Sequence, residues 1–124
     1  MLKIDVGRNK VVARYPVPQA DWITPSADAL WVSGESNEVV RLDPATGAIT
    51  ARVPVGHNPL ASAWVAGELW VPNIDDGTIS VIDPATNSVR TTFPAGRGTL
   101  AVAETAGDAW VSASSDGEIW RIRP

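Results

Sequence analysis

Three copies of one strand–turn–strand unit dominate this sequence. They read LWVSGESNEVVRLD at 30–43, LWVPNIDDGTISVID at 69–83 and AWVSASSDGEIWRI at 109–122. In each copy an apolar run is followed by a short polar turn and a second run with alternating sides, which is the pattern of a β-hairpin. A single hairpin cannot bury both of its faces. Three copies in one chain therefore predict stacked units that bury one another.

The spacing of matching residues gives a repeat of about 40 residues, since Asp43 and Asp83 are 40 residues apart, as are Trp70 and Trp110. A repeat of this length made only of strand signals is typical of β-propeller blades, which have about four strands each. We therefore predict an all-β chain, a β-propeller segment of about three four-stranded antiparallel blades within one repeat domain over 1–124. The expected divisions are a partial blade at 1–17, blades at 22–55 and 60–94, and a partial blade at 99–123.

Residue types within one repeat predict its strands and turns. In the second full copy we expect an innermost strand of small residues over 60–65, and further strands over 68–72, 78–82 and 88–94. The turn between the third and fourth strands reads DPATG at 43–47 and DPATN at 83–87. Asp accepts backbone hydrogen bonds there, Pro presets φ, and Gly or Asn adopts the left-handed conformation. We interpret these residues as turn-building.

Composition excludes several classes of function. The net charge is −4 and Lys and Arg are scattered singly, so no basic surface for nucleic acid is expected. The chain has no cysteine, which excludes disulfides and thiolate metal sites. Its apolar runs are too short to span a membrane. The first ten residues, MLKIDVGRNK, place charges where a signal peptide needs an apolar core, so no export signal is expected.

The tryptophans divide into repeated and unrepeated ones. Trp31, Trp70 and Trp110 share one repeat position, which predicts packing between or within blades. Trp120 stands where the other copies have valine and serine, and we expect it to pack between blades or to cover a partner.

The Trp-Val pair of the second strand, the Asp-Pro-Ala-Thr turns and the closing Val-Pro-Val-Gly at 53–56 resemble YVTN-type bacterial propellers and the related virginiamycin B lyase-like repeats. The resemblance covers essentially the whole chain and implies a propeller fold. Because the shared residues build blades, it implies little about activity. The family includes an antibiotic lyase with a seven-bladed ring, surface-layer and periplasmic propellers, and sensor domains. This chain has fewer blades than complete members, and a chain excised from a longer member would be extracytoplasmic.

Propellers commonly bind ligands at one mouth of their channel, on the face formed by the loops between fourth and first strands and between second and third strands. We refer to it as the loop face. The main candidates for ligand contact on it are His57, Asn58, Asn73, Asp75, Asp76, Arg97 and Asp116. Beside them we expect Gln19, Glu35, Asn37, Ser114 and Ser115.

Four of these candidates invite specific chemistry, of two kinds. His57, the only histidine, could act as a general acid or base with a carboxylate in reach, although it follows Gly56 in an ordinary turn composition. Asn73, Asp75 and Asp76 could offer oxygen ligands to calcium, but their spacing does not fit the twelve-residue calcium loop. We assign no catalytic residue, no metal and no cofactor.

Two functions from different classes stay open. We favour a noncatalytic binding or scaffold module that meets a small molecule or a protein at the loop face. The alternative is an enzyme resembling virginiamycin B lyase, and a streptogramin-linearisation assay would separate the two. The sequence contains no serine-nucleophile elbow, phosphate loop, HExxH motif or dinucleotide fingerprint.

The strand count predicts assembly. Three blades leave raw edges at both ends, whereas closed propellers have about four to eight blades. We expect a homodimer that completes a six-bladed ring, with residues 10–17 of one chain beside 118–123 of the other. Residues 2–5 also have the pattern of a third strand and compete with 119–122 for one position. A fragment of a larger sensor or surface propeller would show the same surplus strand.

Overall fold

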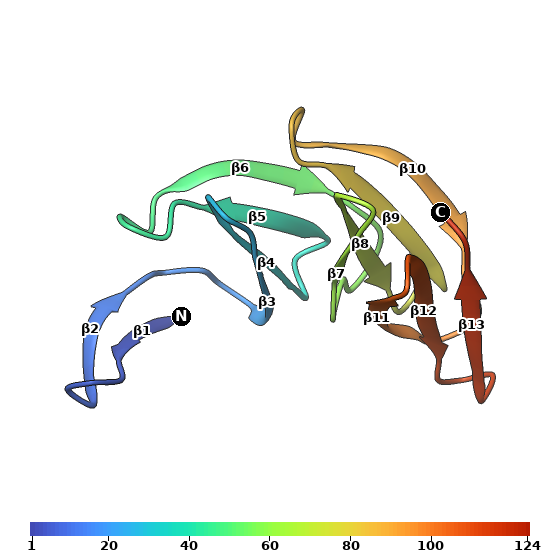
Figure 1. Cartoon of the computed structure of the whole chain (residues 1–124), viewed down its shortest axis with the longest axis horizontal. Helices are drawn as coiled ribbons and strands as arrows, with labels where there is room; N and C mark the ends of the chain where they lie inside the picture. The colour runs from blue at the N-terminus through green and yellow to red at the C-terminus, as the bar shows by residue number, and fades with distance from the viewer.

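The computed structural model describes all 124 residues, and its thirteen regular elements are all β-strands. They form four antiparallel sheets along an open arc (Figure 1). Sheet 1 contains β1 (Leu2–Asp5) and β2 (Lys10–Arg14). Sheet 2 contains β3 (Ala20–Pro25), β4 (Leu30–Gly34), β5 (Glu38–Leu42) and β6 (Ile49–Pro54). Sheet 3 contains β7 (Ala63–Val65), β8 (Glu68–Asn73), β9 (Thr78–Asp83) and β10 (Ser88–Pro94). Sheet 4 contains β11 (Thr99–Thr105), β12 (Asp108–Ala113) and β13 (Glu118–Ile122).

Within each sheet every strand pairs with the next one along the chain. The first strands of sheets 2, 3 and 4 lie towards the concave side of the arc, and β6 and β10 lie on its convex side (Figure 1). The four-stranded sheets confirm the prediction of an all-β chain built from propeller-type blades. None of the chain forms a helix that could cross a membrane.

The innermost strand of sheet 3 is shorter than the sequence predicts. We expected a strand over 60–65, but β7 covers only Ala63–Val65. Ala61 instead forms a parallel bridge to Ala101 of sheet 4, and its carbonyl accepts a hydrogen bond from the backbone N–H of Val102 at 3.0 Å. The beginning of the predicted strand therefore ties two sheets together at the concave side.

The turns between third and fourth strands have the predicted chemistry. Gly47 and Asn87 adopt left-handed φ values of 74° and 52°. The Asp43 carboxylate accepts a hydrogen bond from the backbone N–H of Ala45 at 2.7 Å, which closes the turn. A Cβ on Gly47 would lie 2.0 Å from Cδ1 of Tyr15, so this glycine also makes room for sheet 1 to pack on sheet 2.

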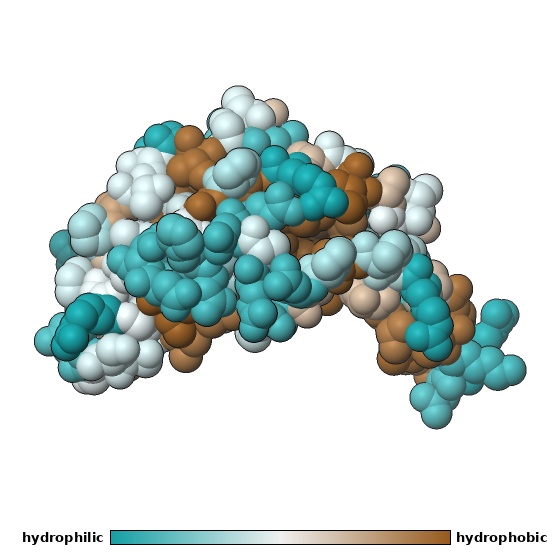
Figure 2. All heavy atoms as spheres, turned by 180° about the vertical axis from the view of Figure 1, so that it is seen from behind, coloured by the Kyte–Doolittle hydropathy of each residue, from teal (hydrophilic) through white to brown (hydrophobic).

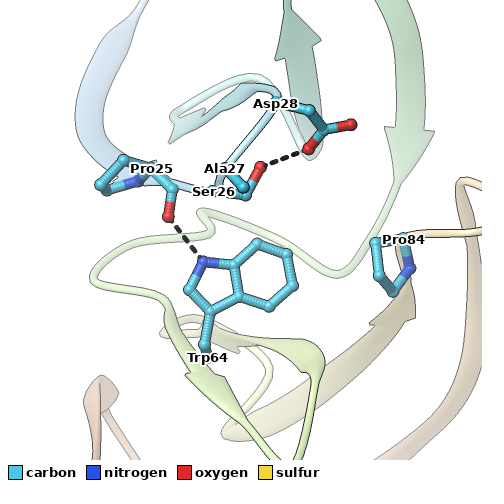
Figure 3. Close-up of a pocket in the computed structure, with 6 residues that line it drawn as sticks. All are labelled: Pro25, Ser26, Ala27, Asp28, Trp64 and Pro84. Atoms are coloured by element: carbon cyan, nitrogen blue, oxygen red, sulfur yellow. Dashed lines mark hydrogen bonds between the residues drawn. The ribbon is translucent and has the colours of Figure 1, made fainter.

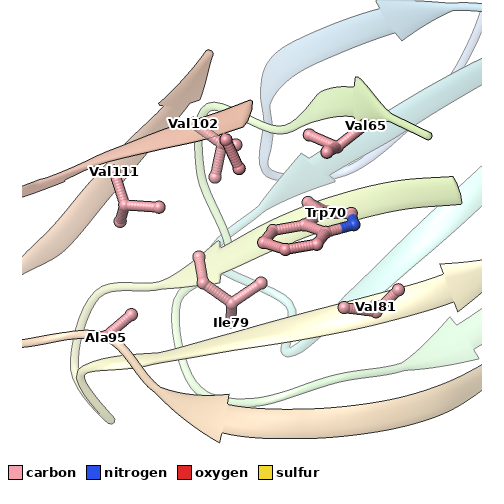
Figure 4. Packing of buried hydrophobic residues seen from close by; sticks show 8 residues of the cluster. Val65, Trp70, Ile79, Val81, Ala95, Val102 and Val111 are labelled. Atoms are coloured by element: carbon pink, nitrogen blue, oxygen red, sulfur yellow. The ribbon is translucent and has the colours of Figure 1, made fainter. Parts of the chain in front are cut away.

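The hydrophobic core lies in layers between successive sheets. We call the side of a sheet that faces the next sheet along the chain its forward face, and the opposite side its rear face. The forward face of sheet 2 consists of Trp31, Val39 and Val53, and it packs on the rear face of sheet 3, which consists of Leu69, Val71 and Ile82. The forward face of sheet 3 consists of Trp70, Ile79 and Val81, and it packs on Val102, Ala109 and Val111 of sheet 4 (Figure 4). Because each layer uses the same repeat positions, the repeat in the sequence is a repeat of these contacts.

Two of the three repeated tryptophans are buried, as the sequence predicts. Trp31 is 1% exposed and Trp70 is 3% exposed. The ring of Trp70 meets Phe93 of the same sheet edge-on, with ring centroids 5.4 Å apart. The third copy, Trp110, lies on the forward face of sheet 4, which no further sheet covers, and it is 36% exposed.

Apolar side chains are exposed at both ends of the arc. In sheet 1 the exposed ones are Leu2, Ile4, Val11 and Val12. Figure 2, seen from behind, shows apolar surface gathered at this end of the arc, on the right of the view. In sheet 4 Ile119 and Trp110 are exposed in the same way. The two ends therefore differ from the interior of the arc, where the repeated apolar positions are covered.

Candidate ligand-binding face

The predicted loop face is built from three tight turns and three linkers. The turns join β4 to β5, β8 to β9 and β12 to β13, and the linkers join β2 to β3, β6 to β7 and β10 to β11. Asn37, Gly77 and Gly117 occupy the same turn position with φ values of 55°, 63° and 69°. The left-handed residue turns the chain sharply. The turns of sheets 3 and 4 approach the linkers that precede those sheets, and the turn of sheet 2 contacts the linker that follows it.

The structure brings His57 and Asp76 together. The Asp76 carboxylate accepts a hydrogen bond from the backbone N–H of His57 at 2.8 Å through Oδ2, and its Oδ1 lies 2.8 Å from Nδ1 of the imidazole. The residues are 19 positions apart, and one carboxylate holds both the backbone and the ring of the histidine. The imidazole itself is largely exposed.

Arg97 and Asp116 form the same arrangement one repeat later. The Asp116 carboxylate accepts hydrogen bonds from the backbone N–H and from Nε of Arg97, both at 2.7 Å. Each residue of this pair lies 40 residues after its counterpart in the His57–Asp76 pair. Sheet 2 has Pro18 and Ser36 at these positions, so it has no such pair. We call the two pairs the loop clamps.

The loop clamps shift the titration of their carboxylates. The backbone N–H of His57 is the main reason why the pKa of Asp76 lies below its ordinary value. The backbone N–H of Arg97 does the same for the pKa of Asp116. Each hydrogen bond lowers the pKa of its carboxyl group, because an N–H donor stabilises the negative charge of the carboxylate that accepts it.

A pH dependence of folding follows from these shifts. Both carboxyl groups have a folded-state pKa below the unfolded value of about 3.9, so they stabilise the fold above about pH 4 and lose that contribution as the pH falls through their folded-state pKa. We expect the double variant Asp76→Asn/Asp116→Asn to lose less stability than the parent chain as the pH is lowered through this range. Urea unfolding at several pH values and constant ionic strength measures it. Parallel pH curves for the two proteins would contradict this assignment.

Asn73 lies beneath the loop face rather than on it. Its side chain is fully buried, and its Oδ1 accepts a hydrogen bond from the backbone N–H of Gly56 at 3.1 Å. Its Nδ2 donates to Oγ1 of Thr78 at 3.0 Å and to Oγ of Ser80 at 2.9 Å. Both ends of the amide are thus occupied by protein groups, and Asn73 supports the linker that carries His57.

The remaining predicted residues lie at the rim of the clamps. The backbone N–H of Asn58 donates to Oδ1 of Asn37 at 3.1 Å, which joins the linker to the turn of sheet 2. Asp75 is exposed at the tip of its turn. The backbone N–H of Ser114 donates to the carbonyl of Gly98 at 2.9 Å. No three histidine or carboxylate side chains in the structure gather closely enough to hold a metal ion.

A cleft that the sequence did not reveal lies between sheets 2 and 3, at the opposite end of the strands from the loop face. It has a volume of about 570 Å³, and its lining consists of Pro25, Ser26, Ala27, Asp28, Trp64 and Pro84 (Figure 3). The indole N–H of Trp64 donates to the carbonyl of Pro25 at 2.7 Å, which holds the ring across the cleft. The only signal in the sequence is that Trp64 does not recur in the other copies.

The comparisons with known proteins describe the fold. No protein-family model matches the chain, and no curated protein matches its sequence. One similar solved structure is a hydrazine synthase from Kuenenia stuttgartiensis, with a TM-score of 0.71, 23% identity, and coverage of 89% of this chain and 37% of that chain. Another is the WD40 β-propeller domain of Doa1, with a TM-score of 0.76, 15% identity, and coverage of 91% and 40%. A third is the computationally designed Ika4 protein, with a TM-score of 0.76, 15% identity, and coverage of 93% and 73%.

The chain therefore spans about two fifths of the length of the first two structures. Identities this low establish the fold alone, since one fold carries many functions. That fold is a segment of a β-propeller.

Proposed function

We propose that this chain is a noncatalytic binding or scaffold module of the YVTN-type and virginiamycin B lyase-like propellers, and that two copies join into a six-bladed ring. In this proposal the loop face, with His57 and Arg97 held in place by the loop clamps, meets a small molecule or a protein. Both side chains are exposed and both are anchored through their own backbone N–H. A pre-positioned donor loses less conformational freedom on binding than a free one.

One observation carries the assembly. Ile119 on the forward face of sheet 4 is 73% exposed, whereas its counterparts Val39 and Ile79 are 0% exposed. Trp110 shows the same contrast with Trp31 and Trp70. Apolar surface of this extent is typical of a surface that another protein covers.

The other end of the arc offers a surface of the matching kind. Sheet 1 has no counterparts of the first and second strands, and the rear face of sheet 2 is open at this place. The resulting apolar cleft has a volume of about 360 Å³, and its lining consists of Met1, Leu2, Lys3, Tyr15, Ile23, Leu30 and Pro44. In the interior of the arc, the forward face of one sheet fills the corresponding space on the next. A second copy can therefore bring the forward face of its sheet 4 to the side of this cleft that sheet 2 forms.

The loop clamps support a role other than catalysis for His57. A carboxylate can orient the imidazole of a histidine that acts as a general base, and Asp76 is placed to do so. Arg97 and Asp116 make the same contacts at the same repeat position, and a guanidinium cannot act as a base at neutral pH. The shared geometry favours a clamp that shapes the loop face over a lyase-type site.

The oligomeric mass tests the proposal. We expect the chain to show twice its mass of 13.1 kDa in light scattering at micromolar concentration. Trp110→Glu places a charge on the exposed forward face, and we expect it to weaken association by roughly a hundredfold, about 3 kcal/mol. Val6→Glu is the control, because Val6 is exposed in the turn of sheet 1 away from either face and should leave the mass unchanged. A parent chain of single mass at every concentration would overturn the assembly.

A further inference from the structure

We infer that the joint between two copies forms by strand exchange: β13 of one copy pairs with β2 of the second and takes the place that β1 occupies in the single chain. This inference rests on the proposed two-copy ring and specifies how its ends meet. Figure 1 places β2 and β13 at opposite ends of the arc, with one edge of each unpaired. The argument uses the interior sheets as templates, because β13 corresponds to β5 and β2 corresponds to β6 in the repeat.

The template gives the register of the joint. In sheet 2 Glu38 lies opposite Pro54 and Leu42 lies opposite Ile49. The equivalent partners across the joint are Glu118 with Pro16, and Ile122 with Val11. In the single chain Val11 is instead opposite Ile4 of β1. β1 and β13 therefore claim the same edge of β2.

The charges along this register match. In sheet 2 Glu38 and Arg52 form an ion pair. Their equivalents are Glu118 on β13 and Arg14 on β2, and neither has a partner of opposite charge within the chain. Glu118 of β13 therefore supplies a carboxylate that can pair with Arg14 across the joint.

The aromatic residues match as well. Trp70 meets Phe93 edge-on within sheet 3. The equivalents are Trp110 in sheet 4 and Tyr15, which follows β2. In the joint, Tyr15 of the second copy would stand beside Trp110 on the forward face. Tyr15 keeps its packing on sheet 2 of its own chain in this arrangement, because Tyr15 and the neighbouring Trp110 both face that sheet.

A hydrogen bond made by β1 indicates that this strand occupies, within one chain, the position that β13 would take in the joint. Arg41 of sheet 2 donates from Nη1 to the carbonyl of Pro84 in the next sheet at 3.1 Å. Lys3 of β1 donates from Nζ to the carbonyl of Pro44, the equivalent atom, at 3.2 Å. The equivalent of Lys3 and Arg41 in β13 is Arg121. β1 thus makes, within one chain, the contact that Arg121 would make to Pro44 of a second copy.

The contacts of β1 and β13 within the single chain indicate which of the two strands is more easily displaced. β1 pairs with β2 alone, over four residue pairs. β13 pairs with β12 over five, and Arg121 is held by the carboxylate of Asp108. Trp120 also packs beside the linker to sheet 4, within 3.4 Å of where a Cβ on Gly96 would lie. Displacing β1 costs one short ladder and the hydrogen bond from Lys3 to Pro44, and in this arrangement β13 replaces the ladder and Arg121 replaces Lys3.

Engineered disulfides test the exchange, since the chain has no cysteine of its own. Val11→Cys/Ile122→Cys places two thiols opposite each other across the joint, and we expect mild oxidation to convert most of the protein into a covalent dimer on a non-reducing gel. Val12→Cys/Ile122→Cys is the register control, because neighbouring residues of a strand point to opposite faces, and it should stay largely uncrosslinked. Ile4→Cys/Val11→Cys reports whether β1 still pairs with β2. In the dimer we expect little of this intrachain disulfide to form.

Charge reversal provides a second measurement that needs no oxidation. Arg14→Glu and Glu118→Arg should each weaken association by about fivefold per joint, and the double variant should recover it. A parent chain with the mass of two copies supports the ring. If, in that dimer, the Ile4→Cys/Val11→Cys disulfide forms fully and Val11→Cys/Ile122→Cys does not crosslink, the strand exchange is wrong although the ring is right. If the parent chain has the mass of one copy, the proposed ring itself fails and the exchange fails with it.

Discussion

Replacing Trp70 by alanine is expected to lower the free energy of unfolding by about 3–5 kcal/mol, the range measured for truncating large buried aromatic side chains. Trp70 is buried among Ile79, Val81 and the side chains of sheet 4, so removing the ring leaves a space with an apolar lining (Figure 4). The loss removes the centre of the layer that joins sheets 3 and 4. Urea unfolding of the variant and the parent chain at the same low concentration measures the difference.

Trp70→Phe is the matched variant. Phenylalanine keeps most of the apolar ring, and it removes an indole N–H that is buried without a hydrogen-bond partner. Because an unpaired buried donor is itself unfavourable, we expect this variant to lose less than half as much stability as Trp70→Ala. Equal losses in the two variants would show that the layer depends on something other than apolar packing at this position.

Gly34→Ala is expected to lower the free energy of unfolding by more than about 3 kcal/mol, a loss that few single substitutions cause. A Cβ on Gly34 would lie 1.6 Å from the carbonyl oxygen of Gln19, and a backbone atom cannot move aside as a side-chain tip can. The substitution would therefore push apart the beginning of the β3–β4 ladder, where Ala20 lies opposite Gly34.

The control for this position is Gly7→Ala in the turn of sheet 1. A Cβ there meets only Oδ1 of Asp5, at 3.4 Å, which is an ordinary contact. We expect a change within about 0.5 kcal/mol, as for most surface substitutions. Thermal or urea unfolding of both variants distinguishes a steric effect at Gly34 from a general intolerance of alanine for glycine. Similar values for the two would contradict the steric explanation.

Much of the fold could be predicted from the sequence because a repeat multiplies weak local signals. The DPATG and DPATN turns, the strand over 88–94 and the burial of Trp31 and Trp70 depend on residues whose chemistry is local, and the structure shows each of them. The start of β7 was not predictable in this way. Ala61 pairs with Ala101 of the next sheet, and no local pattern states which sheet a small residue at the concave side will choose.

The candidate site was predicted less completely. The loop clamps join residues 19 apart, and a comparison of the copies could have shown that a donor at 57 or 97 accompanies a carboxylate at 76 or 116. The burial of Asn73 had no such signal, because asparagine is common both in exposed turns and beneath them. The cleft at Trp64 depends on how two sheets are spaced, which is a property of the assembled arc.

The forward and rear faces differ from each other, so copies of this chain can add only head to tail. Such a contact is heterologous, and a heterologous contact closes into a ring only when the turn made by each copy divides the circle evenly; otherwise it continues as an open fibre. The curvature between neighbouring sheets thus decides between a finite particle and a polymer. The bridge from Ala61 to Ala101 joins neighbouring sheets away from the two ends of the arc, so we expect substitutions there to change that curvature without touching the contacting surfaces.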